Sequence, residues 1–424
     1  MKRRQFLQSL GTVPLVSSMI ARQPGNRIGQ ELQGSELVDA IPDWVRRVRD
    51  QMPVTRERIY FQTGSFGSSP LPVVERVREL MEYQLKGPAV AAYAQKLQEA
   101  EDSCRPLIAR LFGAREQEVA LTHNTTEGMN IVFWSIDWKP GDEIIISNHE
   151  HPALMMPSYN LHARFGVTYR KANIEVGEDV VANVLRELSP RTRLVAMSHV
   201  SRRNGRVIPA KALADALKAR NVRLLLDGAQ AAGNICFRFD ALGVDYYSLC
   251  GHKWLLGPKG AGALLLRKDL LDSTPVSFTG AHSHKFYDDQ GRFEWHPDGR
   301  RYEYGTRAQF NFGGFAEAMR WLEDLGMARV YARIQELSLE AATAIRNSKK
   351  FELVSPLGDA ERSGIVVLRL PKGSLGTAVH QRLDREDRIL VSPLEDPRHL
   401  RVSLHFFNTR NEFATLLSRL EEYC

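Results

Sequence analysis

Several apolar runs in this sequence end in side chains that can bind an anion or carry out acid–base chemistry. Those side chains are a hydroxyl pair, an imidazole, a carboxylate with an amide, and a lysine beside a histidine. They occur in "ALTHNTTEG" (Thr125, Thr126), "IIISNHEH" (His151), "LLLDGAQ" (Asp227, Gln230) and "YYSLCGHK" (Cys250, His252, Lys253). Since ligands gather at the carboxyl ends of parallel strands, we expect these groups to share one site.

The most informative of these groups are Asp227 and Lys253. Asp227 follows three leucines directly, and a carboxylate there is costly to bury unless a cation meets it. Lys253 lies in "GHKWLLGPKG", where glycine and proline crowd the following loop. The pair is therefore predicted to form the centre of a buried site.

Thr125 and Thr126 lie at the start of a predicted helix, where their hydroxyls can cap the helix or bind an anion such as phosphate. A phosphate site, a ring-shaped neighbour, a buried carboxylate and a lysine together match the needs of pyridoxal phosphate. The lysine forms a Schiff base with this cofactor, and the carboxylate pairs with its pyridinium nitrogen. The sequence therefore predicts pyridoxal phosphate as the cofactor.

Regular alternation of strand and helix patterns places these groups in an α/β fold. Apolar runs predict strands near 118–122, 143–148, 167–174, 193–200, 222–228, 246–250 and 262–268. Amphipathic patterns between several of them predict helices near 127–136, 179–188 and 210–220. This rhythm indicates a large, mostly parallel sheet covered by helices on both faces.

The chain divides into three predicted parts. Residues 1–40 are a signal-like segment and linker, residues 41–310 a large cofactor-binding domain, and residues 311–424 a small α+β domain. The last part begins with a long helical tract (315–347) and ends in a helix over "RNEFATLLSRLEEY".

The motifs "NTTEG", "DGAQ", "GHKWLLGPKG" and "RVSLHFFNT" resemble the class V aminotransferase family of pyridoxal phosphate enzymes. The resemblance covers about residues 57–420 and is strongest to the branch of isopenicillin N epimerase-like and cysteine desulfurase-like proteins. It implies the fold type I architecture and a homodimer with the active site at its interface.

The same resemblance implies a role for each candidate residue. Lys253 would carry the cofactor, Asp227 would face its ring nitrogen, and His151 would stack on the ring as a third catalytic group. The remaining cofactor contacts would be Gln230 at the ring hydroxyl, and Thr125, Thr126, His252 and, across the dimer interface, Thr306 at the phosphate. Arg401 would bind the substrate α-carboxylate, for which a guanidinium is well shaped. Cys250 is interpreted as a structural residue or a minor phosphate contact.

Two departures from the family pattern narrow the function. No cysteine occurs from 251 to 423, which disfavours a desulfurase that forms a persulfide on its own cysteine. In "SHVSRRNGRVIP", Arg202 and Arg203 stand where many relatives have an asparagine. These arginines either bind a second acidic group of the substrate or form a solvated basic turn.

The predicted function is therefore an enzyme acting at the Cα of an amino-acid substrate, of the epimerase-like or aminotransferase type. A C–S lyase on a cysteine derivative is the alternative. A non-catalytic protein that binds ligand without turnover is disfavoured. A site that no longer catalyses a reaction has no need of a buried carboxylate such as Asp227, whose burial costs stability.

The charge and the cysteine content of the sequence bear on nucleic-acid binding, metal sites and disulfides. The net charge of +7 over 424 residues is modest and not clustered with aromatic residues, which argues against nucleic acid as a partner. Four widely spaced cysteines predict neither a metal site nor a disulfide framework.

The N-terminus "MKRRQFLQSLGTVPLVSSMIA" resembles a twin-arginine export signal through Arg3 and Arg4. Its apolar run is too short for a stable membrane span. The prediction is export to the periplasm, or a cytoplasmic protein if the signal does not function.

Overall fold

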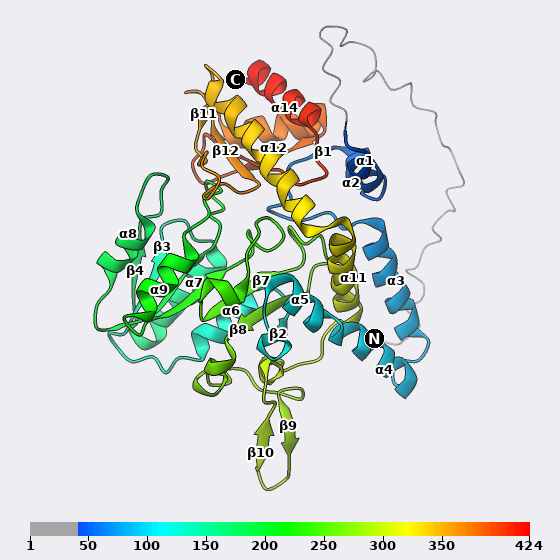
Figure 1. The fold of residues 1–424 in the computed structure, drawn as a ribbon, viewed down its shortest axis with the longest axis vertical. Helices are drawn as coiled ribbons and strands as arrows, with labels where there is room; N and C mark the ends of the chain where they lie inside the picture. Colours follow the sequence, from blue (N-terminus) through cyan, green and yellow to red (C-terminus); the bar gives the residue numbers. More distant parts are fainter. Residues whose placement is uncertain (1–40) are drawn as a thin grey trace, which may run out of the picture. The chain divides into compact units, whose positions relative to one another are not determined.

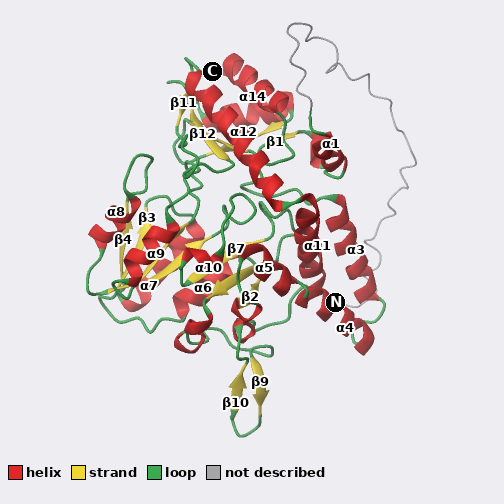
Figure 2. Ribbon diagram, in the orientation of Figure 1, coloured by secondary structure: helices red, strands yellow, loops and turns green. Residues whose placement is uncertain are grey.

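The structure is a computed structural model, and it describes residues 41–424 (Figures 1 and 2). Residues 1–40, which hold the predicted export signal, lie outside the described residues. In the described part of the chain no helix is both long and apolar enough to cross a membrane. No group of three or more potential metal-binding side chains is found there either.

A seven-stranded sheet forms the centre of the larger part. Its spatial order is β2-β8-β7-β6-β5-β3-β4, and β8 alone runs antiparallel to its neighbours. The strands are β2 (Val119–Thr122), β3 (Glu143–Ser147), β4 (Thr168–Ala172), β5 (Thr192–Ser198), β6 (Arg223–Asp227), β7 (Tyr246–Cys250) and β8 (Gly262–Leu266). The predicted mostly parallel sheet is confirmed.

Helices cover both faces of this sheet, because successive strand residues point to opposite sides. In β3, Ile145 joins one core while Ile144 and Ile146 join the other. The helices on the sheet are α5 (Cys104–Phe112), α6 (Thr125–Trp134), α7 (Pro152–Phe165), α8 (Val180–Glu187), α9 (Ala210–Lys218), α10 (Phe239–Leu242) and α11 (Gln309–Leu325), while α3 (Leu71–Leu85) and α4 (Ala91–Asp102) pack on α11. Residues of α5, α8, α9 and α11 bury in the first core, and those of α6 and α7 in the second.

A smaller sheet of order β11-β12-β15-β14 forms near the C-terminus and packs against two long helices. Its elements are α12 (Met327–Asn347), β11 (Glu352–Leu353), β12 (Ile365–Arg369), α13 (Gly376–Arg382), β14 (Ser392–Pro393), β15 (His399–Ser403) and α14 (Arg410–Tyr423). The single helical tract expected at 315–347 is broken at Gly326, whose φ of 84° belongs to the left-handed region.

The N-terminal elements of the described chain pair with strands near the C-terminus. After α1 (Asp43–Asp50) and α2 (Val54–Glu57), β1 (Ile59–Tyr60) pairs in parallel with β13 (Ile389–Leu390). This pairing brings the segment that follows β1 to the edge of the pocket described below. The boundary between a large and a small domain at residue 310 stays a prediction.

A hairpin of β9 (His284–Tyr287) and β10 (Phe293–Trp295) projects away from the large sheet in Figure 1. The sequence analysis did not predict this hairpin or α7. The α7 segment contains Pro157 in its interior and reads poorly as a helix.

Candidate active site

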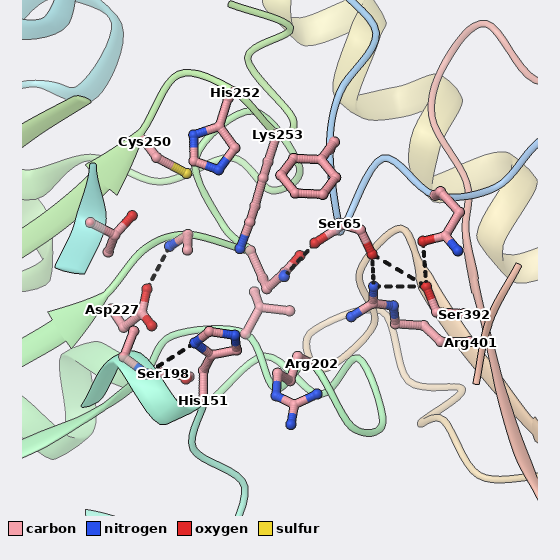
Figure 3. A pocket seen from close by; sticks show the side chains of 18 of the residues that line it. Ser65, His151, Ser198, Arg202, Asp227, Cys250, His252, Lys253, Ser392 and Arg401 are labelled. Carbon is pink, nitrogen blue, oxygen red and sulfur yellow. Dashed lines mark hydrogen bonds between the residues drawn. The ribbon is translucent and has the colours of Figure 1, made fainter. Parts of the chain in front are cut away.

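The carboxyl ends of β2, β5, β6 and β7 open into a pocket of about 510 Å³. The predicted site residues that line it are Thr125, Thr126, His151, Arg202, Asp227, Gln230, Cys250, His252, Lys253 and Arg401. Thr306 and Arg203 are not among its lining residues. The structure thus brings the eight predicted strand-end residues into one pocket, together with Arg202 and Arg401, while their individual roles stay predictions (Figure 3).

Asp227 is the last residue of β6 and is 5% exposed. One carboxylate oxygen accepts a hydrogen bond from the backbone N–H of Ala229 at 2.8 Å. Burial raises the pKa of Asp227, while the positive charge of Lys253 acts in the opposite direction. A carboxylate held in this way offers strong electrostatic stabilisation to any cationic group that enters the pocket.

Lys253 lies three residues beyond β7, in a loop fixed by its neighbours. The Gly67 N–H donates to the carbonyl of His252 at 2.8 Å, and a side chain on Gly67 would collide with the carbonyl of Lys253. Trp254 donates from Nε1 to Oε1 of Gln230 at 2.9 Å. These contacts hold the backbone while the Lys253 amine points into the pocket (Figure 3).

Gln230 has less freedom than predicted. Its Oε1 accepts from Trp254, and its Nε2 donates to the carbonyl of Gly64 at 2.8 Å. One N–H of the amide remains for a ligand, so its predicted role at the ring hydroxyl stays a prediction.

The start of α6 forms one end wall of the pocket. Asn124 caps the helix by accepting from the N–H of Glu127 at 3.0 Å, so Thr125 and Thr126 lie in the first turn. A side chain on Gly128 would collide with the hydroxyl of Ser248, so glycine permits the close approach of α6 to β7.

Two buried polar atoms at this wall, Oγ1 of Thr125 and Nδ1 of His252, have no hydrogen-bond partner in the described part of the chain. Unpaired buried polar atoms are costly unless a ligand pairs with them. Together with the helix N-terminus they form a set of donors that fits a phosphate group. The pocket thus offers partners for the phosphate, the ring nitrogen and the aldehyde of pyridoxal phosphate.

Cys250 lies on this wall as the last residue of β7 and is buried. Burial raises the pKa of its thiol, although the charge of Lys253 acts to lower it. The thiol therefore stays protonated at neutral pH and is a poor nucleophile.

His151 precedes α7 and accepts a hydrogen bond at Nδ1 from the N–H of Ala153 at 3.1 Å. Burial, together with the positive charges of Lys253 and Arg202, lowers the pKa of His151 to about 4. His151 is therefore a neutral ring at physiological pH, with its proton assigned to Nε2 by the Ala153 contact.

Glu150, next to His151, is buried below the pocket floor. Both of its oxygens accept from the N–H of Ser198, at 3.0 and 3.1 Å, and the Ser198 hydroxyl donates at 2.6 Å. Burial raises the pKa of Glu150 to about 7, and the charge of Asp227 adds to this shift. The two carboxyl groups are thus electrostatically coupled, and the protonated form of Glu150 is more favoured than that of an ordinary glutamate.

Arg401 on β15 is almost fully buried, and its hydrogen-bond partners in the described part of the chain are hydroxyl groups. Its Nη2 donates to the hydroxyls of Ser65 at 2.6 Å and Ser392 at 3.0 Å, and its Nε has no partner in the described residues. Burial lowers the pKa of Arg401 to about 10, and repulsion by Arg202 contributes. A buried guanidinium paired only with neutral hydroxyls is poised to bind an anion.

Arg202 lines the pocket, and Arg203 lies behind it. Both pair with Glu395, Arg202 through Nη2 and Arg203 through Nε at 3.7 Å. Thr306 is exposed, next to Arg307, which is paired with Glu101 and Glu303.

The sequence does not predict several residues that line the pocket, namely Gln62, Ser65, Ser198 and Ser392, nor Glu395, which pairs with Arg202. Ser65 and Ser392 belong to the arginine site, and the Ser392 hydroxyl also donates to Oε1 of Gln62 at 2.6 Å. Nothing local to the segment "QTGSFGSSP", which contains Ser65, reveals a distant arginine partner.

The fold and the pocket together define a pyridoxal-phosphate-dependent enzyme of fold type I. The family model of class V aminotransferases matches residues 59–416, and the chain belongs to that family. The predicted family, fold class and cofactor are confirmed.

Curated relatives and solved structures agree with this assignment. The chain is 29% identical over 406 residues to isopenicillin N epimerase of Streptomyces clavuligerus, which covers 90% of this chain and 98% of that protein. It is 26% identical over 415 residues to a cysteine desulfurase of Synechococcus elongatus, which covers 92% of this chain and 65% of that protein.

Among solved structures, the chain is similar to the cystine C–S lyase C-DES in complex with its product cysteine persulfide. That match has a TM-score of 0.83 and 30% identity, and it covers 88% of this chain and 100% of that one. A C-DES variant with glycine covalently linked to the pyridoxal phosphate cofactor gives a TM-score of 0.84 and 29% identity, covering 89% of this chain and 99% of that one.

Proposed function

We propose that this protein transforms an amino-acid substrate at its Cα, as an epimerase-like enzyme or an aminotransferase. The observation that carries the proposal is that buried Asp227 and Lys253, whose charges interact, line one pocket with Arg401, a buried guanidinium that hydrogen-bonds to hydroxyl groups. When bound, the cofactor supplies an electron sink for charge that develops at the substrate Cα.

The chain's own residues supply the remaining functions in this proposal. Asp227 keeps a proton on the ring nitrogen, and Thr125, Thr126 and His252 bind the phosphate. Neutral His151 packs on the ring, while Arg401 fixes the substrate α-carboxylate and so orients Cα. The Lys253 amine, once released by the incoming substrate, moves the proton at Cα.

A second candidate function is C–S bond cleavage in a cysteine derivative. The observation that favours it is the similarity to C-DES, together with the absence of cysteine between 251 and 423. Cys250 does not replace the missing cysteine nucleophile, because burial keeps its thiol protonated.

One experiment separates these reactions. Purified protein is loaded with pyridoxal phosphate and mixed with L- and D-amino acids, including cystine, while the cofactor absorbance is recorded. Inversion of chirality indicates epimerisation, a keto acid that forms only with an acceptor indicates transamination, and pyruvate with sulfur products indicates C–S lysis. Absence of any spectral change with all amino acids would contradict the proposal.

The proposal also includes a homodimer and export. Exposed Thr306 is suited to reach a neighbouring subunit's pocket, and α3 exposes apolar side chains at Val74, Met81 and Leu85. Export rests on the sequence motif at Arg3 and Arg4 alone. Fractionation of cells that carry Arg3→Lys with Arg4→Lys tests it, because a twin-arginine signal so altered should leave the protein in the cytoplasm.

A further inference from the structure

The end of the pocket formed by Arg401 and Arg202 carries more positive charge than its neighbours neutralise. Arg401 has hydroxyl partners only, and Arg202 and Arg203 share the single carboxylate of Glu395. His151, which lies beside both pocket arginines, is neutral because its pKa is lowered to about 4. Three guanidinium groups thus face one carboxylate. Two anionic groups of a ligand would balance the remaining positive charge.

The two arginines of the pocket wall are close enough to interact. The charge of Arg202 lowers the pKa of Arg401, and Figure 3 shows Arg202 between His151 and Arg401. Arg401 lies on a strand of the small sheet, whereas Arg202 lies after β5 of the large sheet. A ligand that contacts both must therefore carry its anionic groups on different sides of the pocket.

The turn that carries Arg202 is held in place by side-chain hydrogen bonds. The Ser201 hydroxyl accepts from the N–H of Arg203 at 3.2 Å and bonds to Nδ1 of buried His149 at 2.9 Å. Nε2 of His149 bonds in turn to Glu175 at 2.7 Å. The side chain of Arg202 is 15% exposed, and its Nε is buried without a partner in the described residues.

The other end of the turn is equally fixed. Arg206 donates to the carbonyls of Ile174 at 3.3 Å and Glu178 at 2.8 Å, and the Ser363 hydroxyl donates to the carbonyl of Gly205 at 2.7 Å. A solvated basic turn needs no such anchoring. The alternative left open by the sequence, that these arginines only face solvent, is therefore disfavoured for Arg202.

Glu395 has the properties of a displaceable partner. It lies between β14 and β15, and its side chain is 49% exposed, so it can swing into water at little cost. Burial acts to raise the pKa of Glu395, but the Arg202 hydrogen bond prevails and holds it below its usual value. An incoming carboxylate could take its place and form the same charge-assisted hydrogen bonds with Arg202.

We propose that Arg202, supported by Arg203, is a second carboxylate subsite, and that Glu395 occupies it until the substrate arrives. The substrate is then an α-amino acid whose side chain carries a further carboxylate. This inference rests on the proposed function, because it assigns the α-carboxylate to Arg401.

The test compares acidic amino acids with neutral ones of similar size. Aspartate, glutamate and 2-aminoadipate are titrated against asparagine, glutamine and norleucine into the full chain loaded with pyridoxal phosphate. Dissociation constants come from the change in cofactor absorbance and, independently, from calorimetry. The variants are Arg202→Gln and Glu395→Gln, with Arg186→Gln on the exposed face of α8 as the control that removes an equal charge elsewhere.

The wild type should bind at least one acidic amino acid about tenfold more tightly than its neutral partner, as expected for one charge-assisted contact. Arg202→Gln should remove this preference and leave the neutral partner within about twofold, whereas Glu395→Gln should strengthen binding of the acidic partner. Arg186→Gln should leave both affinities unchanged.

Two results would overturn the subsite. One is a wild type that does not distinguish the acidic from the neutral partners. The other is an equal loss for both partners in Arg202→Gln, which would place Arg202 at the α-carboxylate. Both leave the proposed function intact if neutral amino acids still change the cofactor absorbance. If no amino acid of either kind does so, the proposed function and the subsite fail together.

Discussion

Asp227 and Lys253 lie at the carboxyl ends of the adjacent strands β6 and β7, and Lys253 is the cation that opposes the rise in the Asp227 pKa. A buried carboxylate needs such a partner. With pyridoxal phosphate held by Lys253, the ring nitrogen of the cofactor would supply a cationic partner for Asp227. Asp227 and Lys253 would therefore both contribute to holding the cofactor.

Replacement of Lys253 by alanine should abolish both the absorbance of lysine-linked cofactor and turnover, because no other amine lines the pocket of the described chain. The spectrum of the purified variant after addition of pyridoxal phosphate measures this. Lys218→Ala, at an exposed site on α9, is the control and should behave as wild type. Retained turnover in Lys253→Ala would refute the assignment.

Asp227→Asn should preserve cofactor binding yet lower the rate on the order of 100-fold or more, because a neutral amide cannot stabilise a protonated ring nitrogen. Asparagine can still accept the hydrogen bond from Ala229, so the local fold should survive. Single-turnover rates measure the effect, with the exposed Asp240→Asn as control. An unchanged rate would rule out this role for Asp227.

The sequence predicts features that depend on neighbouring residues, such as strands and their polar ends, but not contacts between residues far apart in the chain. The seven strands of the large sheet were predicted within two residues at each end, since their apolar runs and polar ends are local features. Ser65 and Ser392 were missed because they contact Arg401 only after the chain brings 65 and 401 together. The break at Gly326 was also missed, because a glycine within a helical pattern does not by itself reveal a positive φ.

Arg401→Lys should weaken substrates that carry an α-carboxylate about tenfold or more while leaving the cofactor spectrum unchanged. Lysine keeps the charge, but it lacks the planar fork that holds both Ser65 and Ser392 and a carboxylate at once. KM for an amino acid and for its α-amide should be compared in both proteins. Equal changes for the acid and the amide would remove Arg401 from the carboxylate site.

Buried histidines should make the protein less stable in mild acid. Burial lowers the pKa of His199 and His405 to about 4 from an ordinary 6.5. Between these values the unfolded chain binds protons that the folded chain does not, so the free energy of unfolding falls as pH is lowered. The expected loss from pH 7 to pH 5 is about 2 kcal/mol per histidine, measured by urea denaturation.

Glu150 should oppose this trend. Its folded pKa of about 7 lies above the ordinary 4.5, so its contribution is fully present below 4.5 and is lost as pH rises through 7. Glu150→Gln removes the compensation and should steepen the loss of stability from pH 7 to pH 5. A pH dependence that stays the same in this variant would show that Glu150 is ionised throughout.

The proposed active site shared between two subunits can be tested by mixing Lys253→Ala with Thr306→Ala. Thr306 is exposed and outside its own chain's pocket, whereas Lys253 lies inside it. If Thr306 completes the neighbouring subunit's phosphate site, a dimer of one Lys253→Ala chain and one Thr306→Ala chain contains one doubly altered site and one wild-type site. Co-refolded equal amounts should then recover about a quarter of wild-type activity, since about half of the dimers are mixed and each has one intact site.

The control is a mixture of Lys253→Ala with Asp227→Asn, two changes within the same pocket. Mixed dimers of these chains contain no wild-type site, so their activity should not exceed the sum of the separate variants. Recovery only in the Thr306 mixture therefore requires that Thr306 and Lys253 of one site come from different chains. Equal activity in both mixtures would show that Thr306 serves its own chain, and an active Thr306→Ala variant on its own would show that Thr306 serves neither site.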